Sequence, residues 1–162
     1  MDLRDVFLNE LGEMLEVERT LAEDVLPDVF VQARNQQLRD AIQEHTAQTQ
    51  EHVARVEQVF SELGEKPRTA RSHGLEGLRR QHEESLGGVA GLSLRDLIHA
   101  AAAADAEHYE ISGYRSLIMA AELLGEPESV RLLEHNLHEE EEALEKLEKS
   151  IPEKLGEELV PA

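Results

Sequence analysis

Hydrophobic residues recur every three or four positions along most of this chain, which is the spacing that places them on one face of an α-helix. In the first segment the apolar positions are Leu3, Phe7, Leu11, Met14, Leu21 and Val25. The pattern predicts a helix from Asp2 into the low thirties. Pro27 lies inside the pattern and lacks a backbone N–H, so we expect a kink or break near Leu26.

A second stripe predicts a helix from Asn35 to Leu63, followed by Gly64 and Pro67, which are usual stop signals. The polar stretch from Lys66 to Gly74 is typical of a loop, and the segment from Leu75 to Ser85 is compatible with a short helix. Gly87, Gly88 and Gly91 then interrupt the chain. A long connection therefore separates the second long helix from the third.

Two further long helices follow. Ser93 is a candidate N-cap for a helix that runs to about Leu124, where Gly125 and Pro127 end it. The last apolar stripe predicts a helix over about 128–150, closed by Pro152. The remaining segment, Glu153 to Ala162, is charged, and we expect it to be loosely held.

No segment alternates between apolar and polar residues as a strand does. We therefore predict an all-α, ferritin-like four-helix bundle over residues 1–152, with a short extra helix in the long crossover and a charged C-terminal tail over 153–162. The alternative is a simple up-down bundle extended by one short helix.

Charge and composition narrow the function. The net charge of −19 repels phosphates, which argues against binding nucleic acid or an anionic membrane surface. The absence of cysteine excludes disulfides, thiolate catalysis and cysteine-ligated zinc. The first residues lack an apolar signal region, and no apolar run is long enough to span a membrane, so we expect a cytoplasmic protein. Few lysines and many acids also fit a halophilic protein, although an ordinary acidic protein remains the alternative.

Polar residues interrupt the apolar stripes near the middle of each long helix. Glu18, Glu107 and Glu140 occupy core positions of the first, third and fourth helices, and His45 and His52 interrupt the second, around Thr49. Antiparallel helices of similar length align their midpoints, so these side chains should meet in one layer. Carboxylate and imidazole ligands together suit iron or manganese. The alternative is that each Glu lies at the edge of its stripe with its carboxylate in solvent, and that each His is satisfied locally.

Three segments resemble the YciE/YciF family of ferritin-like proteins. They are Val17-Glu18-Arg19-Thr20-Leu21, His52 to Phe60 running into Leu63-Gly64-Glu65-Lys66-Pro67, and Glu107-His108-Tyr109-Glu110-Ile111 followed by Tyr114. The resemblance covers about Phe7 to Leu147. It implies a ferritin-like bundle, a homodimer or higher homo-oligomer, a stress-related role and a di-metal centre with Glu18, Glu107, Glu110 and Glu140 at or near the metal.

The chain departs from that family at two places. The second helix has His45-Thr46-Ala47-Gln48-Thr49 where the family has two carboxylates, and Leu144 replaces a frequent Asp. The Glu-x-x-His pair of the last helix is also missing, because Ala143 follows Glu140 by three positions. The di-iron site therefore looks eroded, which leaves open one metal ion, two weakly held ions through His45 and His52, or none.

Two functions follow. The first is a metal-binding protein with oxidase-type or peroxide chemistry, in which Glu18, Glu107 and Glu140 hold Fe or Mn and the histidines complete the ligand set. The second is a non-enzymatic, dimeric structural or stress protein whose metal layer has become a buried polar network.

Overall fold

The computed structural model describes residues 1–159. Its first long helix is built from α1 (Leu3–Thr20), the π-helical segment η1 (Leu21–Val25) and α2 (Leu26–Gln32). Asp2 caps α1 by accepting a hydrogen bond from the backbone N–H of Asp5, whose own side chain accepts from the N–H of Asp2. The helix is therefore continuous through the predicted break.

The irregularity caused by Pro27 lies in the turn before it. Proline cannot donate the backbone hydrogen bond of a regular helix, and in η1 the hydrogen bonding shifts by one residue, so that the N–H of Leu26 donates to the carbonyl of Leu21. The expected disturbance near Leu26 is thus a π-helical turn over Leu21–Val25.

The second long helix, α3 (Gln36–Glu62), begins and ends as its sequence predicts. Asn35 caps it by accepting from the N–H of Leu38 at 3.0 Å, and Gly64 adopts a left-handed φ of 70° just after its end. The crossover then carries α4 (His73–Leu86), capped by Ser72. The third long helix, α5 (Leu92–Leu124), begins two residues earlier than predicted: Gly91 is its N-cap and Ser93 lies within its first turn.

The last helix extends beyond its predicted end. It consists of α6 (Pro127–Glu145), the π-helical segment η2 (Lys146–Ser150) and α7 (Ile151–Leu159). The prediction that Pro152 closes the helix is wrong, because this proline follows a π-helical turn as Pro27 does. Leu155 of α7 is fully buried in the core, so the described part of the predicted tail packs against the bundle. Residues 160–162 of that tail lie outside the described residues.

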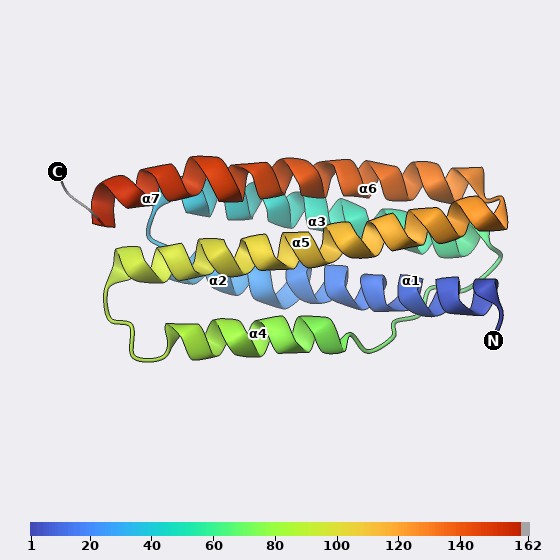
Figure 1. The fold of residues 1–162 in the computed structure, drawn as a ribbon, viewed down its shortest axis with the longest axis horizontal. Helices are drawn as coiled ribbons and strands as arrows, with labels where there is room; N and C mark the ends of the chain where they lie inside the picture. Colours follow the sequence, from blue (N-terminus) through green and yellow to red (C-terminus); the bar gives the residue numbers. More distant parts are fainter. Residues whose placement is uncertain (160–162) are drawn as a thin grey trace.

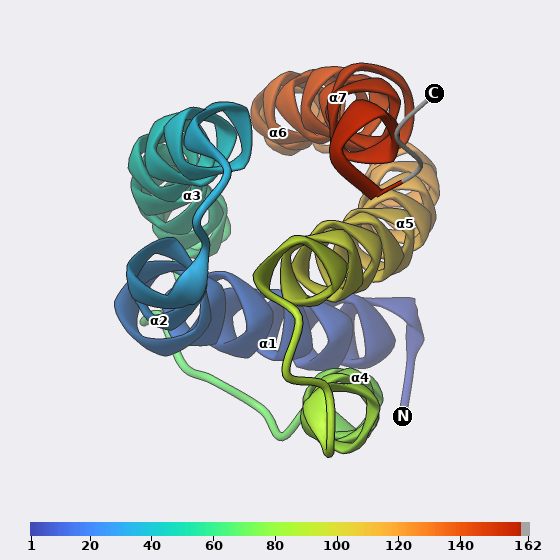
Figure 2. The same cartoon turned by 90° about the vertical axis from the view of Figure 1, so that its left-hand side faces the viewer.

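The four long helices form a bundle with the ferritin-like connection. Figure 1 shows that α1 and α6 run in one direction and that α3 and α5 run in the other. The helices α1 and α6 each pack against both α3 and α5, and α4 packs along α5 on the outside (Figure 2). Because α3 and α5 are parallel, a long crossover must join them, which excludes the simple up-down alternative. The predicted fold class is confirmed, and the described residues form no strand.

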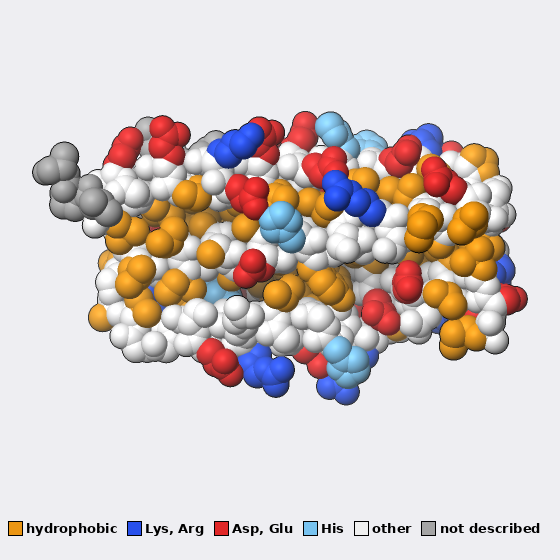
Figure 3. All heavy atoms as spheres, in the orientation of Figure 1, with side chains coloured by type: hydrophobic (Ala, Val, Ile, Leu, Met, Phe, Trp, Pro, Cys, Tyr) orange, Lys and Arg blue, Asp and Glu red, His pale blue; other side chains and the backbone are white. Residues whose placement is uncertain are grey.

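Apolar side chains of all four long helices form one core, with Phe7, Phe60 and Tyr114 among its largest buried members. On the face drawn in Figure 3, acidic side chains are spread over the surface with hydrophobic ones between them. Within residues 1–159, no helix combines the length and the apolar character that a membrane span requires.

Candidate metal centre

The polar residues that interrupt the apolar stripes converge at the centre of the bundle. Each long helix contributes, because residues three, four or seven positions apart share one helix face. The six side chains are between 0 and 6% exposed. They are Glu18 of α1, His45 and His52 of α3, Glu107 and Glu110 of α5, and Glu140 of α6.

These six residues form two overlapping groups, each compact enough to surround one cation. The first consists of Glu18, His52 and Glu140, and the second of His45, Glu107, Glu110 and Glu140. Within each group, one nitrogen or carboxylate oxygen per residue lies within 4.8 Å of all the others. Glu140 belongs to both groups, so its two oxygens could bridge two ions.

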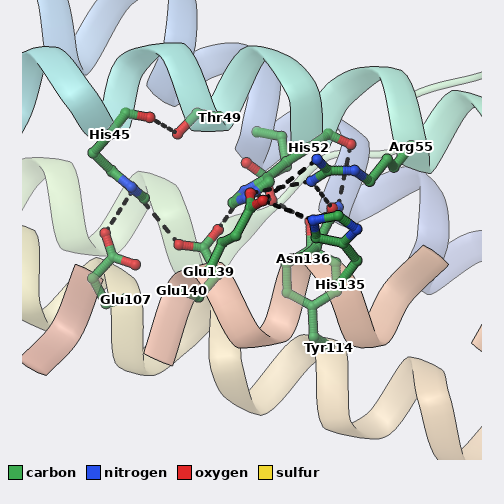
Figure 4. Close-up of polar contacts among 11 residues, drawn as sticks. His45, Thr49, His52, Arg55, Glu107, Tyr114, His135, Asn136, Glu139 and Glu140 are labelled. Atoms are coloured by element: carbon green, nitrogen blue, oxygen red, sulfur yellow. Dashed lines mark hydrogen bonds and ion pairs between the residues drawn. The ribbon is translucent and has the colours of Figure 1, made fainter. Parts of the chain in front are cut away.

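Close contacts between imidazoles and carboxylates hold the cluster together (Figure 4). His45 Nε2 lies 2.7 Å from Glu107 Oε1 and 3.6 Å from Glu140 Oε2. His52 Nδ1 lies 2.8 Å from Glu140 Oε1 and 3.4 Å from Glu18 Oε1. Each histidine therefore turns a ring nitrogen towards Glu140 from one side of the cluster.

A second layer of polar residues orients His52. Its Nε2 lies 2.8 Å from Glu139 Oε2, and Arg55 donates to both oxygens of Glu139. His135 Nε2 is also 2.9 Å from Glu139 Oε1. A carboxylate on the far nitrogen of a ligating histidine fixes the ring and its tautomer, which leaves Nδ1 directed at the cluster.

Tyr114 and Asn136 connect Glu18 to the same layer. The Tyr114 hydroxyl donates to Glu18 Oε1, and Asn136 Nδ2 donates to the Tyr114 hydroxyl at 3.0 Å and to the carbonyl of His52 at 3.3 Å. Arg55 in turn donates to Asn136 Oδ1 at 3.0 Å. Glu18 and His52 are thus positioned by a continuous chain of hydrogen bonds that ends at the surface.

Unsatisfied polar atoms show that the cluster fits a cation. Five buried atoms of its six residues have neither a hydrogen-bond nor an ion-pair partner among the described residues: Glu18 Oε2, His45 Nδ1, Glu107 Oε2 and both oxygens of Glu110. Burying a carboxylate without a partner is unfavourable by several kcal/mol. Divalent cations bound by oxygen and nitrogen ligands would satisfy these atoms, so the donor set and its burial fit Fe or Mn.

Burial also changes the protonation of the acids. Loss of hydration raises the pKa of Glu107 and of Glu140 to about 7 each. The pKa of Glu110 lies well above its usual range, because the side chain is fully buried and because three carboxylates surround it. Burial likewise raises the pKa of Glu18, although His52 opposes that shift. A cation that binds these carboxylates must displace their protons, so its binding tightens as pH rises.

The negative charge of the buried carboxylates raises the pKa values of His52 and Tyr114. Burial alone would lower the pKa of His52, but the charges of Glu18 and Glu140 and their contacts with the ring raise it to about 11. Burial and the charge of Glu18 raise the pKa of Tyr114 well above its usual range. In the metal-free protein His52 is therefore a cation at neutral pH that compensates part of the buried negative charge, and a metal ion bound at Nδ1 would replace the proton there.

The predicted convergence is confirmed for Glu18, His45, His52, Glu107 and Glu140, and the alternative of solvent-exposed carboxylates is wrong. Glu110, which only the family resemblance implied, lies in the same cluster. That these residues bind a metal stays a prediction. The structure also shows a contact that the sequence analysis does not include, between Glu139 and His52. The sequence gives no signal for this contact, because Glu139 adjoins Glu140 in an otherwise exposed acidic run.

The structure changes the interpretation of the missing carboxylates of the second helix. A di-iron bundle typically takes four carboxylates and two histidines, from two Glu and two Glu-x-x-His pairs. Here the same number of donors comes from four Glu and two His, with both histidines on α3 and two carboxylates on α5. The second helix lacks carboxylates, but the bundle as a whole supplies the full number of carboxylates and histidines.

Comparison with known proteins identifies the family. Residues 2–160 match the family model described as Domain of unknown function (DUF892). The chain is 31% identical over 139 residues to Protein YciF of Escherichia coli strain K12, which covers 85% of this chain and 83% of that protein.

Two solved structures are similar over nearly the whole chain. The crystal structure of the E. coli stress protein YciF has a TM-score of 0.88 at 28% identity, covering 96% of this chain and 98% of that one. YcfI from Rhodopseudomonas palustris, proposed to be a structural protein, has a TM-score of 0.89 at 34% identity, covering 92% and 94%. By its sequence and its fold, the chain belongs to the YciE/YciF family of ferritin-like proteins, DUF892.

Proposed function

We propose that this protein binds two Fe or Mn ions at the bundle centre and uses them for oxidase-type or peroxide chemistry in a stress response. The observation that carries the proposal is the cluster of four buried carboxylates and two buried histidines, in which five buried atoms, both oxygens of Glu110 among them, have neither a hydrogen-bond nor an ion-pair partner among the described residues. The E. coli relative described as a stress protein supports the physiological setting.

The charge of the cluster supports two ions over none. If all four carboxylates were ionised, their charge would exceed the positive charge of His52 and leave a buried excess of negative charge. Without a cation the acids must stay partly protonated, as the raised pKa values of Glu107 and Glu140 indicate. Two divalent ions would compensate the charge and fill the ligand positions.

The two overlapping groups assign the ligands. Glu18 and His52 would hold one ion, His45, Glu107 and Glu110 the other, and Glu140 would be shared. When bound, a pair of redox-active ions supplies the two electrons that reduce hydrogen peroxide and two protons to two molecules of water. The chain itself excludes bulk water from the cluster, and Glu107 and Glu140 would release the protons that they hold in the metal-free protein when they bind the ions.

The second candidate function is a non-enzymatic structural or stress protein. It is favoured by the contacts of His45 with Glu107 and of His52 with Glu140, which neutralise part of the cluster without a metal. The R. palustris relative proposed to be structural also supports it. The homodimer implied by the family resemblance is retained as a proposal under both functions.

Metal content separates the two functions. We expect two ions per chain by mass spectrometry after expression in medium supplemented with iron and manganese. Because both groups share Glu140, Glu140→Gln should weaken the binding of both ions by about 100-fold or more. Glu142→Gln, two positions away on the exposed face of α6, is the matched control and should keep both ions.

Two results would refute the metal function. One is wild-type protein without bound metal from such medium, and the other is Glu140→Gln protein with the wild-type metal content. The metal-free variant should remain folded, because removing one of four buried carboxylates relieves repulsion. Its circular dichroism and thermal unfolding in EDTA verify this.

A further inference from the structure

A cavity beneath the crossover helix leads from the surface to the metal cluster. It lies between η1, α2, α3, α4 and α5 and has a volume of about 40 Å³. Its walls are mostly apolar, and include Leu21, Leu26, Val29, Leu75, Ala102 and Ala106. We call this cavity the α4 chamber.

The two ends of the α4 chamber differ in character. At the inner end it reaches His45 and Glu107 of the cluster, which are buried, and at the outer end it reaches exposed Arg79 and half-buried His82. His82 Nε2 lies 3.0 Å from His99 Nδ1, so α4 and α5 are joined by this histidine pair in the wall of the chamber. The other nitrogen of His99, Nε2, is buried without a hydrogen-bond partner among the described residues.

A wider surface hollow of about 400 Å³ adjoins the outer end of the chamber. Val25, Val29, Arg79 and His82 line both spaces. The hollow carries four exposed acids against the one arginine: Glu23, Asp24, Asp28 and Glu83. Any molecule that reaches the chamber from this side therefore passes a region of negative charge.

Charge and size together restrict what the chamber admits. The acidic hollow disfavours anions, and the apolar walls disfavour a hydrated metal ion, which would have to lose its water without replacement ligands. One water needs roughly 10–15 Å³ of such volume, so the 40 Å³ chamber has room for a molecule of two heavy atoms. A neutral molecule of two heavy atoms is neither repelled by the acidic hollow nor excluded by the apolar walls.

We propose that the α4 chamber binds a neutral oxidant of two heavy atoms, dioxygen or hydrogen peroxide, and delivers it to the His45–Glu107 side of the cluster. His82 and His99 are positioned to control its outer end, and the unpaired Nε2 of His99 offers a hydrogen bond in an otherwise apolar wall. This inference rests on the proposed function and adds to it the route by which the oxidant arrives.

A second cavity reaches the same two cluster residues from the opposite side. It lies between α3, α5, α6 and η2 and has a volume of about 20 Å³. Lys146 and Glu44, which line it, form an ion pair at 2.8 Å. We prefer the α4 chamber as the route because it has twice the volume and apolar walls.

Xenon tests whether the chamber accepts small neutral molecules. Xenon binds apolar cavities, and its site can be located by anomalous scattering in pressurised crystals of the metal-free protein. We expect xenon beneath α4 in the wild type. Ala102→Leu, which fills the chamber, should abolish this site, whereas Ala101→Leu, at the neighbouring exposed position of α5, should preserve it. Ala106→Leu is a second filling variant in case Ala102→Leu destabilises the fold.

Oxidation kinetics test whether the chamber is the route. Protein loaded with Fe²⁺ is mixed with dioxygen in one arm and with anaerobic hydrogen peroxide in the other, and metal content is measured before mixing. Filling the chamber should slow oxidation about tenfold or more, a barrier change of about 1.4 kcal/mol, in the arm that contains the natural oxidant. His82→Ala, which widens the outer end, should speed the same arm, while His73→Ala at an exposed position of α4 should not.

The outcomes separate this inference from the proposed function. Slowing in the dioxygen arm, in the peroxide arm or in both supports the route and identifies the oxidant. Unchanged rates in both filling variants that bind metal normally, or xenon retained in them beneath α4, overturn the route and leave the metal function standing. A wild-type protein that binds no metal overturns both.

Discussion

The two halves of the cluster share Glu140 but are supported in different ways. The half formed by Glu18 and His52 is enclosed: Tyr114 holds Glu18, and Glu139 holds the far nitrogen of His52. In the half formed by His45, Glu107 and Glu110, neither His45 Nδ1 nor either oxygen of Glu110 has a hydrogen-bond partner among the described residues. Two cavities reach this second half, and neither of them is lined by Glu18 or His52.

This difference in support and access indicates that the two halves of the cluster have different roles. A rigid, enclosed ligand set favours tight binding, whereas a site at which substrate reacts needs an accessible position. We therefore interpret the Glu18–His52 half as the more strongly organised part and the His45–Glu107–Glu110 half as the part open to small molecules. Three measurements can break or sharpen this comparison.

The largest expected effect is the loss of stability when either histidine is removed from the metal-free protein. His52→Ala removes a buried cation that contacts Glu18, Glu139 and Glu140, and we expect the free energy of unfolding to fall by about 3–5 kcal/mol. His45→Ala should lower it by about 1–3 kcal/mol, because its main contact is with Glu107. Urea unfolding in EDTA measures both. Equal losses would show that the two halves are equally organised.

The convergence of the cluster could be predicted because its signal is local. Each of Glu18, His45, His52, Glu107 and Glu140 interrupts an apolar stripe near mid-helix, and helix geometry then brings these residues together. Glu110 was implied only by the family resemblance, although it follows Glu107 by three positions and shares its face. It is the residue that restores the number of carboxylates.

The contacts missed by sequence reasoning depend on tertiary structure. Glu139 turns to His52 because Arg55 on α3 lies opposite it, and His82 meets His99 only because the crossover places α4 along α5. The prediction that the last helix ends at Pro152 is wrong for a related reason. A π-helical turn before the proline accommodates the missing N–H, and burial of Leu155 favours continuing the helix. Local helix propensity predicts neither the π-helical turn nor the burial of Leu155.

A smaller effect is expected when the support of His52 is weakened without touching a proposed ligand. Glu139→Gln keeps the size of the side chain but removes the charge that orients the imidazole. Metal affinity of the Glu18–His52 half should fall by about 10–100-fold, while the other half is unaffected. Co²⁺ titration followed by its visible absorption resolves the two binding steps, with Glu142→Gln as control. Equal weakening of both steps would contradict the division between the halves.

The last effect is spread over a wide pH range: a pH dependence in which the two halves act in different ranges. Burial raises the pKa of Glu107 from 4.5 to about 7, so the stability associated with its protonated form is present below pH 4.5 and is lost as pH rises towards 7. The pKa of His52 is raised from 6.5 to about 11, so its contribution is present below pH 6.5 and is lost as pH rises through 11. Both shifts make the metal-free protein less stable as pH rises, by up to about 1.4 kcal/mol per pH unit for each proton.

Unfolding of the metal-free protein at a series of pH values between 5 and 10 would separate these contributions. Glu107→Gln should flatten the decline below pH 7, whereas His52→Ala should flatten it above pH 7. Bound metal should reverse the trend below pH 7, because ions compete with protons for Glu107 and Glu140 and bind more tightly as these groups ionise. A metal-free protein that becomes more stable from pH 5 to 7 would show that the cluster acids are already ionised and compensated. The buried excess charge, on which the case for two ions depends, would then not exist.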